Sequence, residues 1–406
     1  MSLPKINIAF TNGNIGSVVS TEDGIFGLAA SAKAVGNFAL NTPYAVYGMA
    51  DVATLGIISD VENYLFHKTL REFYEQAGEG TKLWIIGFAQ TTKVSDWFTP
   101  VAGVAPVHAL LDKANGEVSC LFTSFSPDGA YALTIADGVD EDVVLARTKA
   151  QALAEAYATT NFAPLFVILE GYGFTGVHTD LLDLSQEENN RVAVFLGDTE
   201  KRSGAVAILG AASHILAARL AATQVHENAG KVKNGSLETL EAYILDTAIE
   251  SYNIEAIHDK GYITFRTHVR KSGYYFTDDP LATAETDDYK FISRRRVIDK
   301  AFRLAHSVAS NEILADFDLM NDGTLSPFFA KNVEGNIERT IAERMTAKGE
   351  LSADASNKDD LGVIARFDMT KNVSISNQID LTIQVRPKGY ARFFEIKLGY
   401  NVNLNN

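Results

Sequence analysis

The feature that most constrains the fold is a series of short apolar runs separated by segments with helical periodicity. Three of these runs, Leu83–Ala89, Pro164–Glu170 and Val192–Leu196, are apolar along almost their whole length. A strand that is apolar at nearly every position has both faces buried, as in a parallel or mixed sheet covered on both sides. The sequence therefore predicts an α/β domain with a central mixed sheet and helices on both faces.

Other segments of the first 260 residues fit the same alternation. Glu141–Thr159 is a clear helix, because Ala146, Ala150, Leu153 and Tyr157 recur at spacings of four, three and four residues. We place this α/β domain over residues 22–260. Its further predicted strands are Gly24–Ala32 and Val118–Phe125, and its further predicted helices are Asn63–Ala77, Val104–Ala114 and Gly204–Ala222.

Beyond residue 260 the pattern changes to short strands and isolated helices. Residues 261–392 are expected to form a C-terminal α+β, β-rich domain. Ser326 and Pro327 make a good N-cap and first helical residue, because proline has no amide to leave unpaired there. The other elements predicted are strands Tyr262–Arg270, Tyr274–Thr277, Gly362–Asp368 and Val373–Arg386, and helix Asp288–Ala309.

Both ends of the chain alternate apolar and polar residues, as half-buried strands do. We interpret residues 1–21 and 393–406 as extended arms. One explanation is strand donation to a neighbouring subunit, and the other is pairing inside the chain's own fold. The apolar positions of these intersubunit arms are Ile6, Ile8, Phe10, Phe394, Ile396, Leu398, Tyr400, Val402 and Leu404.

Charge and cysteine content exclude several classes of protein. With 36 Lys and Arg against 51 Asp and Glu, the net charge is −15, which repels nucleic acid and anionic membranes. The single cysteine, Cys120, lies in an apolar run and is expected to be a buried thiol rather than a nucleophile. The first residues lack the apolar core of a signal peptide, so we expect a soluble protein made in a reducing compartment.

Motifs for catalysis or cofactor binding are weak. A GxGxxG pattern at residues 171–176 follows a predicted strand, with Asp198 as a possible ribose ligand, but a glycine-rich loop explains it better. No histidine has metal-ligand spacing, and residues 316–323 fit a turn better than a calcium loop. Arg295 and Arg296 are spaced to pair with Asp299 on a solvated helix face. The adjacent acidic residues at 278–279 and 287–288 are expected to form a solvent-exposed acidic rim. No metal or cofactor is predicted.

The segment Gly261–Met345 resembles the C-terminal region of contractile tail sheath proteins, particularly the Mu-like phage branch and its relatives in Bacteroidetes. The matching motifs are Gly273–Pro280 (GYYFTDDP), Ala282–Ala284, Thr286–Tyr289 and Arg296–Ala305 (RVIDKAFRLA). They cover about a fifth of the chain. The remainder is similar to that family in layout, with an N-terminal arm, an α/β middle and a C-terminal domain.

The resemblance implies a structural, non-enzymatic subunit that forms stacked rings around an inner tube and contracts to drive the tube. It implies no cofactor, and as partners it implies further copies of the chain, the inner tail tube and the baseplate, but neither nucleic acid nor membrane. The expected location is a virion tail assembled in the bacterial cytoplasm. Two alternatives stay open: an α/β enzyme or nucleotide-binding protein, and a baseplate or tube module.

Overall fold

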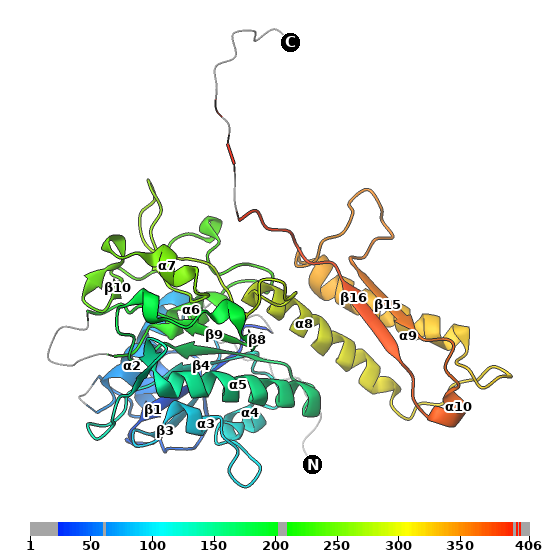
Figure 1. Ribbon diagram of the computed structural model, residues 1–406. Coiled ribbons are helices and arrows are strands. Elements are labelled where there is room, and N and C mark those ends of the chain that lie inside the picture. The colour runs from blue at the N-terminus through cyan, green and yellow to red at the C-terminus, as the bar shows by residue number, and fades with distance from the viewer. Residues whose placement is uncertain (1–22, 60–61, 202–208, 393–394, 397, 399–406) are drawn as a thin grey trace, which may run out of the picture. The chain divides into compact units, whose positions relative to one another are not determined.

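Figure 1 shows the computed structural model, which describes residues 23–59, 62–201, 209–392, 395, 396 and 398. The chain divides after Ser307 into two compact units. Unit 1 denotes the described residues up to Ser307, and unit 2 denotes those that follow. Among the helices described, none combines the length and the apolar character that crossing a bilayer requires.

The core of unit 1 is a six-stranded sheet. Its strands are β1 (Phe26–Ala32), β2 (Tyr44–Val46), β3 (Leu83–Ala89), β4 (Cys120–Ser124), β7 (Phe166–Glu170) and β9 (Val192–Phe195). They lie in the order β2-β3-β1-β4-β7-β9. All are parallel except the edge strand β2. The register places Phe26 of β1 beside Leu83 of β3 and Cys120 of β4.

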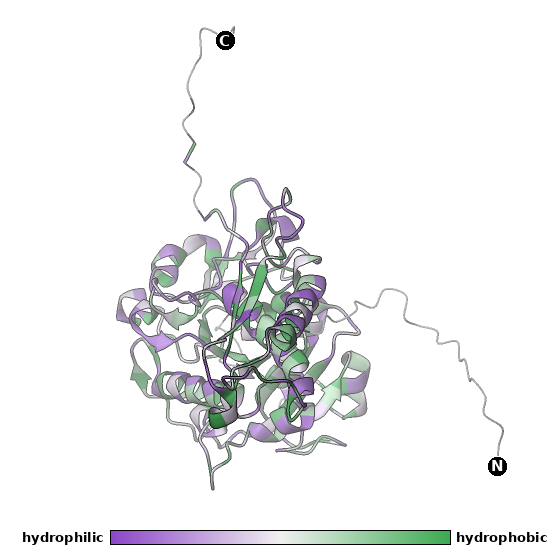
Figure 2. Cartoon of the chain, turned by 90° about the vertical axis from the view of Figure 1, so that its right-hand side faces the viewer, coloured by the Kyte–Doolittle hydropathy of each residue, from purple (hydrophilic) through white to green (hydrophobic). Residues whose placement is uncertain are grey.

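Helices cover both faces of this sheet, as predicted. Phe122 of β4 stacks on Phe73 of α2 (Tyr64–Ala77), with ring centroids 5.6 Å apart. The preceding residue, Leu121, points to the opposite face. There it meets Gly27, and a Cβ on Gly27 would lie 3.0 Å from Leu110 of α4 (His108–Ala114). In addition, α6 (Ser213–Ala221) packs on α2, and α5 (Glu141–Thr160) packs on α3 (Val94–Trp97). Figure 2 shows helices that carry both hydrophilic and hydrophobic residues, as amphipathic helices do.

The remaining strands of unit 1 are two-residue pairs. They are β5 (Ile135–Ala136) with β6 (Val139–Asp140), β8 (Glu188–Asn189) with β14 (Ala282–Thr283), β10 (Tyr243–Ile244) with β11 (Thr247–Ala248), and β12 (Phe265–Arg266) with β13 (Tyr275–Phe276). The strands predicted over Tyr262–Arg270 and Tyr274–Thr277 are therefore much shorter than expected. The other helices are α1 (Met49–Thr54), α7 (Ile254–His258) and α8 (Ile292–Ala309).

Residues 261–307 belong to unit 1, so the division of the chain differs from the predicted boundary after residue 260. Ile263 forms a parallel bridge with Phe195 of β9. The rings of Phe265 and Phe276 pack against Phe195 at centroid distances of 5.1 and 5.8 Å. Because these aromatic side chains complete the core beside the edge strand β9, the segment extends the α/β unit instead of beginning a new one.

Unit 2 combines one long helix with a two-stranded hairpin, so its described residues are α+β rather than β-rich. The helix α9 (Pro327–Ile341) continues into a π-helical turn, Ala342–Thr346. The strand β15 (Val363–Phe367) packs on α9 and pairs antiparallel with β16 (Leu381–Val385). As predicted, Ser326 occupies the N-cap and Pro327 the first turn of α9, although the Ser326 side chain makes no capping hydrogen bond.

Three predicted elements are wrong in part. The predicted strand Val373–Arg386 begins as the short helix α10 (Val373–Ser376), because the Asn372 side chain accepts a hydrogen bond from the Ile375 amide at 3.1 Å. The helix predicted from Val104 begins at His108, since Val104 forms a bridge with Val101. In the described residues the helix predicted over Gly204–Ala222 begins at Ser213, and residues 202–208 lie outside them.

The boundary after Ser307 can be tested with two truncated chains. Removing residues 261–307 would uncover Phe195 and would take Asp299 away from the buried Arg191, which it contacts at 3.1 Å. Loss of the ion-pair partner of Arg191 lowers the free energy of unfolding by about 3–5 kcal/mol. Exposure of the Phe195 side chain lowers it by about 1.5–3 kcal/mol more. We expect a chain ending after Ser307 to melt cooperatively by circular dichroism and a chain ending after Lys260 not to. A cooperative melt of the shorter chain would contradict this division.

Candidate functional site

The predicted arm residues lie mostly outside the described part of the chain. Those outside are Ile6, Ile8, Phe10, Phe394, Tyr400, Val402 and Leu404. The two that are described, Ile396 and Leu398, are 81% and 97% exposed. Their side chains therefore find no cover among the described residues of their own chain, and their role as arms stays a prediction.

The hairpin β15–β16 in unit 2 is the place where a further strand could bind. In an antiparallel pair, alternate residues direct their backbone N–H and C=O groups toward the partner strand and away from it. The Asp368 amide donates to the Asp380 carbonyl at 2.9 Å, and the Arg386 amide donates to the Gly362 carbonyl at 2.8 Å. Even-numbered residues therefore bond across the hairpin, and odd-numbered residues direct their backbone groups outward.

The outer edge of β15 is occupied by two carboxylates of α9. The Ala365 amide donates to Glu338 Oε1 at 2.9 Å, and the Phe367 amide donates to Glu334 Oε1 at 2.8 Å. Glu334 and Glu338 are four residues apart and so share one face of the helix. The guanidinium of Arg366 lies 2.7 Å from Glu338 and helps to hold it. A strand arriving here would have to displace both carboxylates, so this edge is closed.

Among the described residues, nothing covers the outer edge of β16. Leu381, Ile383 and Val385 direct their backbone groups outward, and no other described residue bonds to those groups. Their side chains share a face with Val363 and Ala365, which are buried, yet all three are only partly buried. An apolar row with unpaired backbone groups is a template for strand addition. We call this edge, Leu381–Val385, the acceptor edge.

A second polar group lies inside unit 1, around the ends of β7 and β9. Lys68 of α2 is 2.6 Å from Asp198, and Glu72 of α2 is 2.8 Å from His214 of α6. The Thr199 hydroxyl donates to Glu72 at 2.9 Å. None of the four ionisable side chains is more than 11% exposed. This buried charge cluster, Lys68, Glu72, Asp198 and His214, ties α2 to α6 and to the loop after β9.

The electrostatics of the cluster favour mutual neutralisation. Burial alone would raise the pKa of Glu72, but His214, Lys68 and Thr199 together lower it to about 2. Burial would likewise lower the pKa of Lys68, whereas the neighbouring Asp198 and Glu72 raise it. Both side chains are therefore charged at neutral pH, and each faces an opposite charge. Such an arrangement holds helices together and leaves neither group available to take up or release a proton near pH 7.

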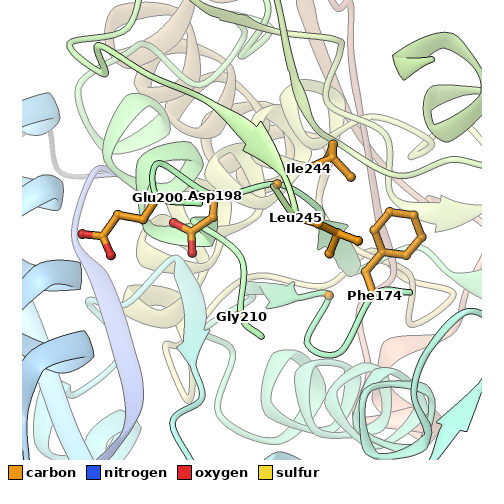
Figure 3. Close-up of a pocket in the computed structure, with 8 residues that line it drawn as sticks. Phe174, Asp198, Glu200, Gly210, Ile244 and Leu245 are labelled. Atoms are coloured by element: carbon orange, nitrogen blue, oxygen red, sulfur yellow. The ribbon is translucent and has the colours of Figure 1, made fainter. Parts of the chain in front are cut away.

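The space beside the cluster is small. Two adjoining cavities have volumes of about 20 Å³ each, close to what one water molecule occupies. Figure 3 shows one of them, with Asp198 and Glu200 on one side and Phe174, Ile244 and Leu245 on the other. Neither cavity accommodates a nucleotide. A larger hollow in unit 2, about 480 Å³, is lined by side chains that pair with one another, such as Arg386 with Asp360.

The glycine pattern at residues 171–176 makes a turn. It follows β7, as predicted, but leads into a three-residue 3₁₀ turn, His178–Asp180, where a dinucleotide site would need the N-terminus of a helix. Asp198, which could have bound a ribose, is paired with Lys68 instead. Gly173 adopts φ +72°, and a Cβ on Gly171 would lie 2.2 Å from Leu196. The glycines thus serve the turn and close packing.

Two of the charged motifs are more buried than predicted. Arg295 pairs with Asp299 at 2.7 Å, as its spacing indicates, but the pair is buried, and Arg191 reaches the same carboxylate at 3.1 Å. Asp279 is fully buried and accepts a hydrogen bond from the Ser293 amide at 3.0 Å, where α8 begins. The prediction of solvated faces is therefore wrong for these residues.

The remaining candidate ligands do not converge. Cys120 is fully buried in β4, and burial raises the pKa of its thiol. Within the described ranges, no three His, Cys, Asp or Glu side chains are placed to hold a metal ion. Residues 316–323 end in a turn in which the Gly323 amide donates to the Met320 carbonyl at 2.9 Å.

Solved structures share this fold over almost the whole chain. A chain in the contracted helical sheath of the anti-feeding prophage is 17% identical, with a TM-score of 0.63 and coverage of 99% of this chain and 100% of that one. A chain in the baseplate of the same particle is 14% identical, with a TM-score of 0.64 and the same coverage. A chain in the contracted sheath complex of PVC, an extracellular contractile injection system, is 12% identical, with a TM-score of 0.61 and 99% of each chain covered.

The fold is therefore the one found in chains of contractile sheaths. The chain belongs to the DUF2586 family, whose N-terminal domain matches residues 3–280 and whose C-terminal domain matches residues 288–405. No curated protein sequence matches it. The particular branch of sheath proteins, Mu-like or Bacteroidetes, stays a prediction.

The buried charge cluster predicts an acid-dependent loss of stability. Because the pKa of Glu72 is about 2 in the folded chain and about 4.3 when unfolded, folding favours its ionised form. This contribution is complete above about pH 4.3 and is lost as the pH falls toward 2. We expect Glu72→Gln to lower the free energy of unfolding by about 3 kcal/mol at pH 7.

Urea unfolding from pH 7 to pH 3 checks this. The difference between the unaltered chain and Glu72→Gln should be constant down to about pH 5 and then narrow. Glu75→Gln is the matched control, because Glu75 lies on the same helix with a side chain that is 59% exposed. A difference for Glu72→Gln that stays constant down to pH 3 would show that Glu72 is not held ionised by the cluster.

Proposed function

We propose that this protein is the subunit of a contractile tail or injection-system sheath. In this role it polymerises into a helical cylinder of stacked rings around an inner tube and contracts to drive the tube. The fold shared with chains of contracted sheaths supports the assignment. The observation that carries the proposal is the acceptor edge. A hairpin with one closed and one open edge can pair with a strand of another chain on one side only.

The occupant of the acceptor edge is the C-terminal arm of another copy. In that arm Phe394, Ile396, Leu398, Tyr400, Val402 and Leu404 alternate with other residues, which gives an extended chain one apolar face. Placed beside β16, this face continues the apolar row of Leu381, Ile383 and Val385 on the side of the hairpin away from the edge that α9 closes. The N-terminal arm, with Ile6, Ile8 and Phe10, has the same alternation and adds outside the first donated strand.

The proposed partners are further copies of the chain, the inner tail tube and the baseplate. Baseplate association is supported by a structural neighbour that comes from a baseplate. Nucleic acid and membranes are not proposed partners, since the net charge of −15 opposes both. The polymer would belong to a virion tail assembled in the bacterial cytoplasm.

Contraction in this proposal is a change between two arrangements of the same folded subunits. The extended cylinder is metastable, and shortening exchanges weak contacts for larger buried interfaces. The donated strands keep the subunits connected while they move. The role is structural rather than enzymatic, and it needs no cofactor.

The acceptor edge can be blocked at a single backbone group. Ile383→Pro removes an amide that points outward and is not bonded to β15, and proline is tolerated on strand edges. Ile383→Ala removes the same side chain beyond Cβ but keeps the amide. We expect Ile383→Pro to stay monomeric while Ile383→Ala still forms wide, striated cylinders by electron microscopy. Equal assembly by the two variants would contradict strand addition at β16. Thin smooth tubes from the unaltered chain would favour a tube module.

The donor strand can be tested by deletion. Removing Glu395–Asn406 should leave a folded, soluble subunit that cannot polymerise, because each large side chain lost from the intersubunit contact contributes about 1.5–3 kcal/mol. Leu398→Asp should have the same effect, whereas Lys397→Asp, on the other face of the alternation, should be tolerated. Sedimentation and thermal melting are the measurements. If the truncated chain aggregates or loses its cooperative melt, the segment belongs to its own subunit's core.

A further inference from the structure

Asp23, the first described residue, is held where the N-terminal arm enters unit 1. Its carboxylate is only 7% exposed and lies 2.8 Å from Lys300 Nζ and 3.1 Å from a guanidinium nitrogen of Arg303. Lys300 and Arg303 are three residues apart on α8, so both reach Asp23 from one face of that helix. The Asp23 carbonyl also accepts a hydrogen bond from the Ser119 hydroxyl at 2.8 Å. The residue is therefore fixed through both its side chain and its main chain.

One of the cations that hold Asp23, Arg303, also contacts the chain just before the sheet strand β7. Arg303 Nη1 donates to the Pro164 carbonyl at 2.7 Å, shortly before β7 begins. Burial would raise the pKa of Asp23, but Lys300 and Arg303 lower it, so the carboxylate is ionised at neutral pH. Charge-assisted hydrogen bonds of this kind are stronger than those between neutral groups.

The position of Asp23 determines which interactions are loaded first when the N-terminus is pulled. Asp23 precedes β1 by three residues, about 10 Å of extended chain. β1 itself pairs with β3 from Phe26 to Ala32 and with β4 on its other side. Tension applied before Asp23 therefore reaches the ion pairs with α8 before it reaches the hydrogen bonds of the central strand.

The helix that holds Asp23 also leads out of unit 1. α8 runs from Ile292 to Ala309, and the division between the units falls after Ser307, within its last turn. Arg303 lies about one turn before that division. A force that arrives at Asp23 is thus delivered to the helix from which the chain continues into unit 2.

We propose that Asp23, Lys300 and Arg303 form an anchor that passes tension from the N-terminal arm to α8 and protects β1 from being pulled out of the sheet. The source of that tension rests on the proposed function, in which a neighbouring subunit holds the arm. The anchor itself is a property of the single chain and can be measured without a polymer.

Single-molecule force spectroscopy on the full chain tests the anchor. The chain is held at its N-terminus and at a cysteine introduced by Ala152→Cys, an exposed position on α5, while the native Cys120 is buried. Asp23→Asn keeps the size of the side chain and removes its charge. We expect it to lower the force of the first rupture about twofold, and we expect Asp23→Glu to restore part of that force.

Asp198→Asn supplies the matched control, since it removes the charge that pairs with the buried Lys68 at 2.6 Å in the same unit, on elements that carry neither point of attachment. It should lower the melting temperature and leave the first rupture force unchanged. If Asp23→Asn, like the control, lowers the melting temperature and leaves the first rupture force unchanged, the three residues only stabilise the fold. The proposal of an anchor is then wrong. Failure of the unaltered chain to form cylinders would overturn the proposed function instead, because the force measurement does not depend on assembly.

Discussion

Unit 1 depends on keeping both faces of its sheet free of water. β1 and β4 are buried at every position and β3 at all but its last, so no charged side chain can lie on either face there without losing its hydration. Ionisable groups therefore lie at the ends of the strands, where several of them are paired with an opposite charge. Lys68 meets Asp198, and Asp23 meets Lys300 and Arg303. These ion pairs attach α2 to the loop after β9 and α8 to the residue before β1, and a further pair, His214 with Glu72, joins α6 to α2.

Much of the fold could be predicted because its strongest signals are local. The run Leu83–Ala89 is β3 with the predicted bounds, and the helical periodicity of Glu141–Thr159 gives α5 to within one residue. Alternation alone was misleading near Val373, where a hydrogen bond from a backbone amide to the Asn372 side chain starts a short helix. The first compact unit extends past residue 260 because the packing of Phe265 and Phe276 on Phe195 joins segments distant in sequence, and periodicity does not record such contacts.

For the candidate site, too, local patterns could be predicted and contacts between distant residues could not. The alternation at the chain ends predicts a donated strand, but which edge receives it depends on how residues 334 and 338 meet residues 365 and 367 in space. The i,i+4 spacing of Glu334 and Glu338 was visible, although an exposed helix face commonly has the same spacing. Asp23 and Arg303 are separated by 280 positions, so no pattern in a single sequence could have paired them.

Closing β15 with carboxylates gives the hairpin a direction of growth. A two-stranded ribbon with two free edges could extend on both sides and branch without limit, which is the route to fibrous aggregates. With Glu334 and Glu338 bonded to one edge, the sheet can lengthen only away from α9, and every added strand has a defined position in the order. In the proposed polymer this fixes the side of the hairpin on which every junction forms, so the direction of each connection is set by the geometry of the subunit.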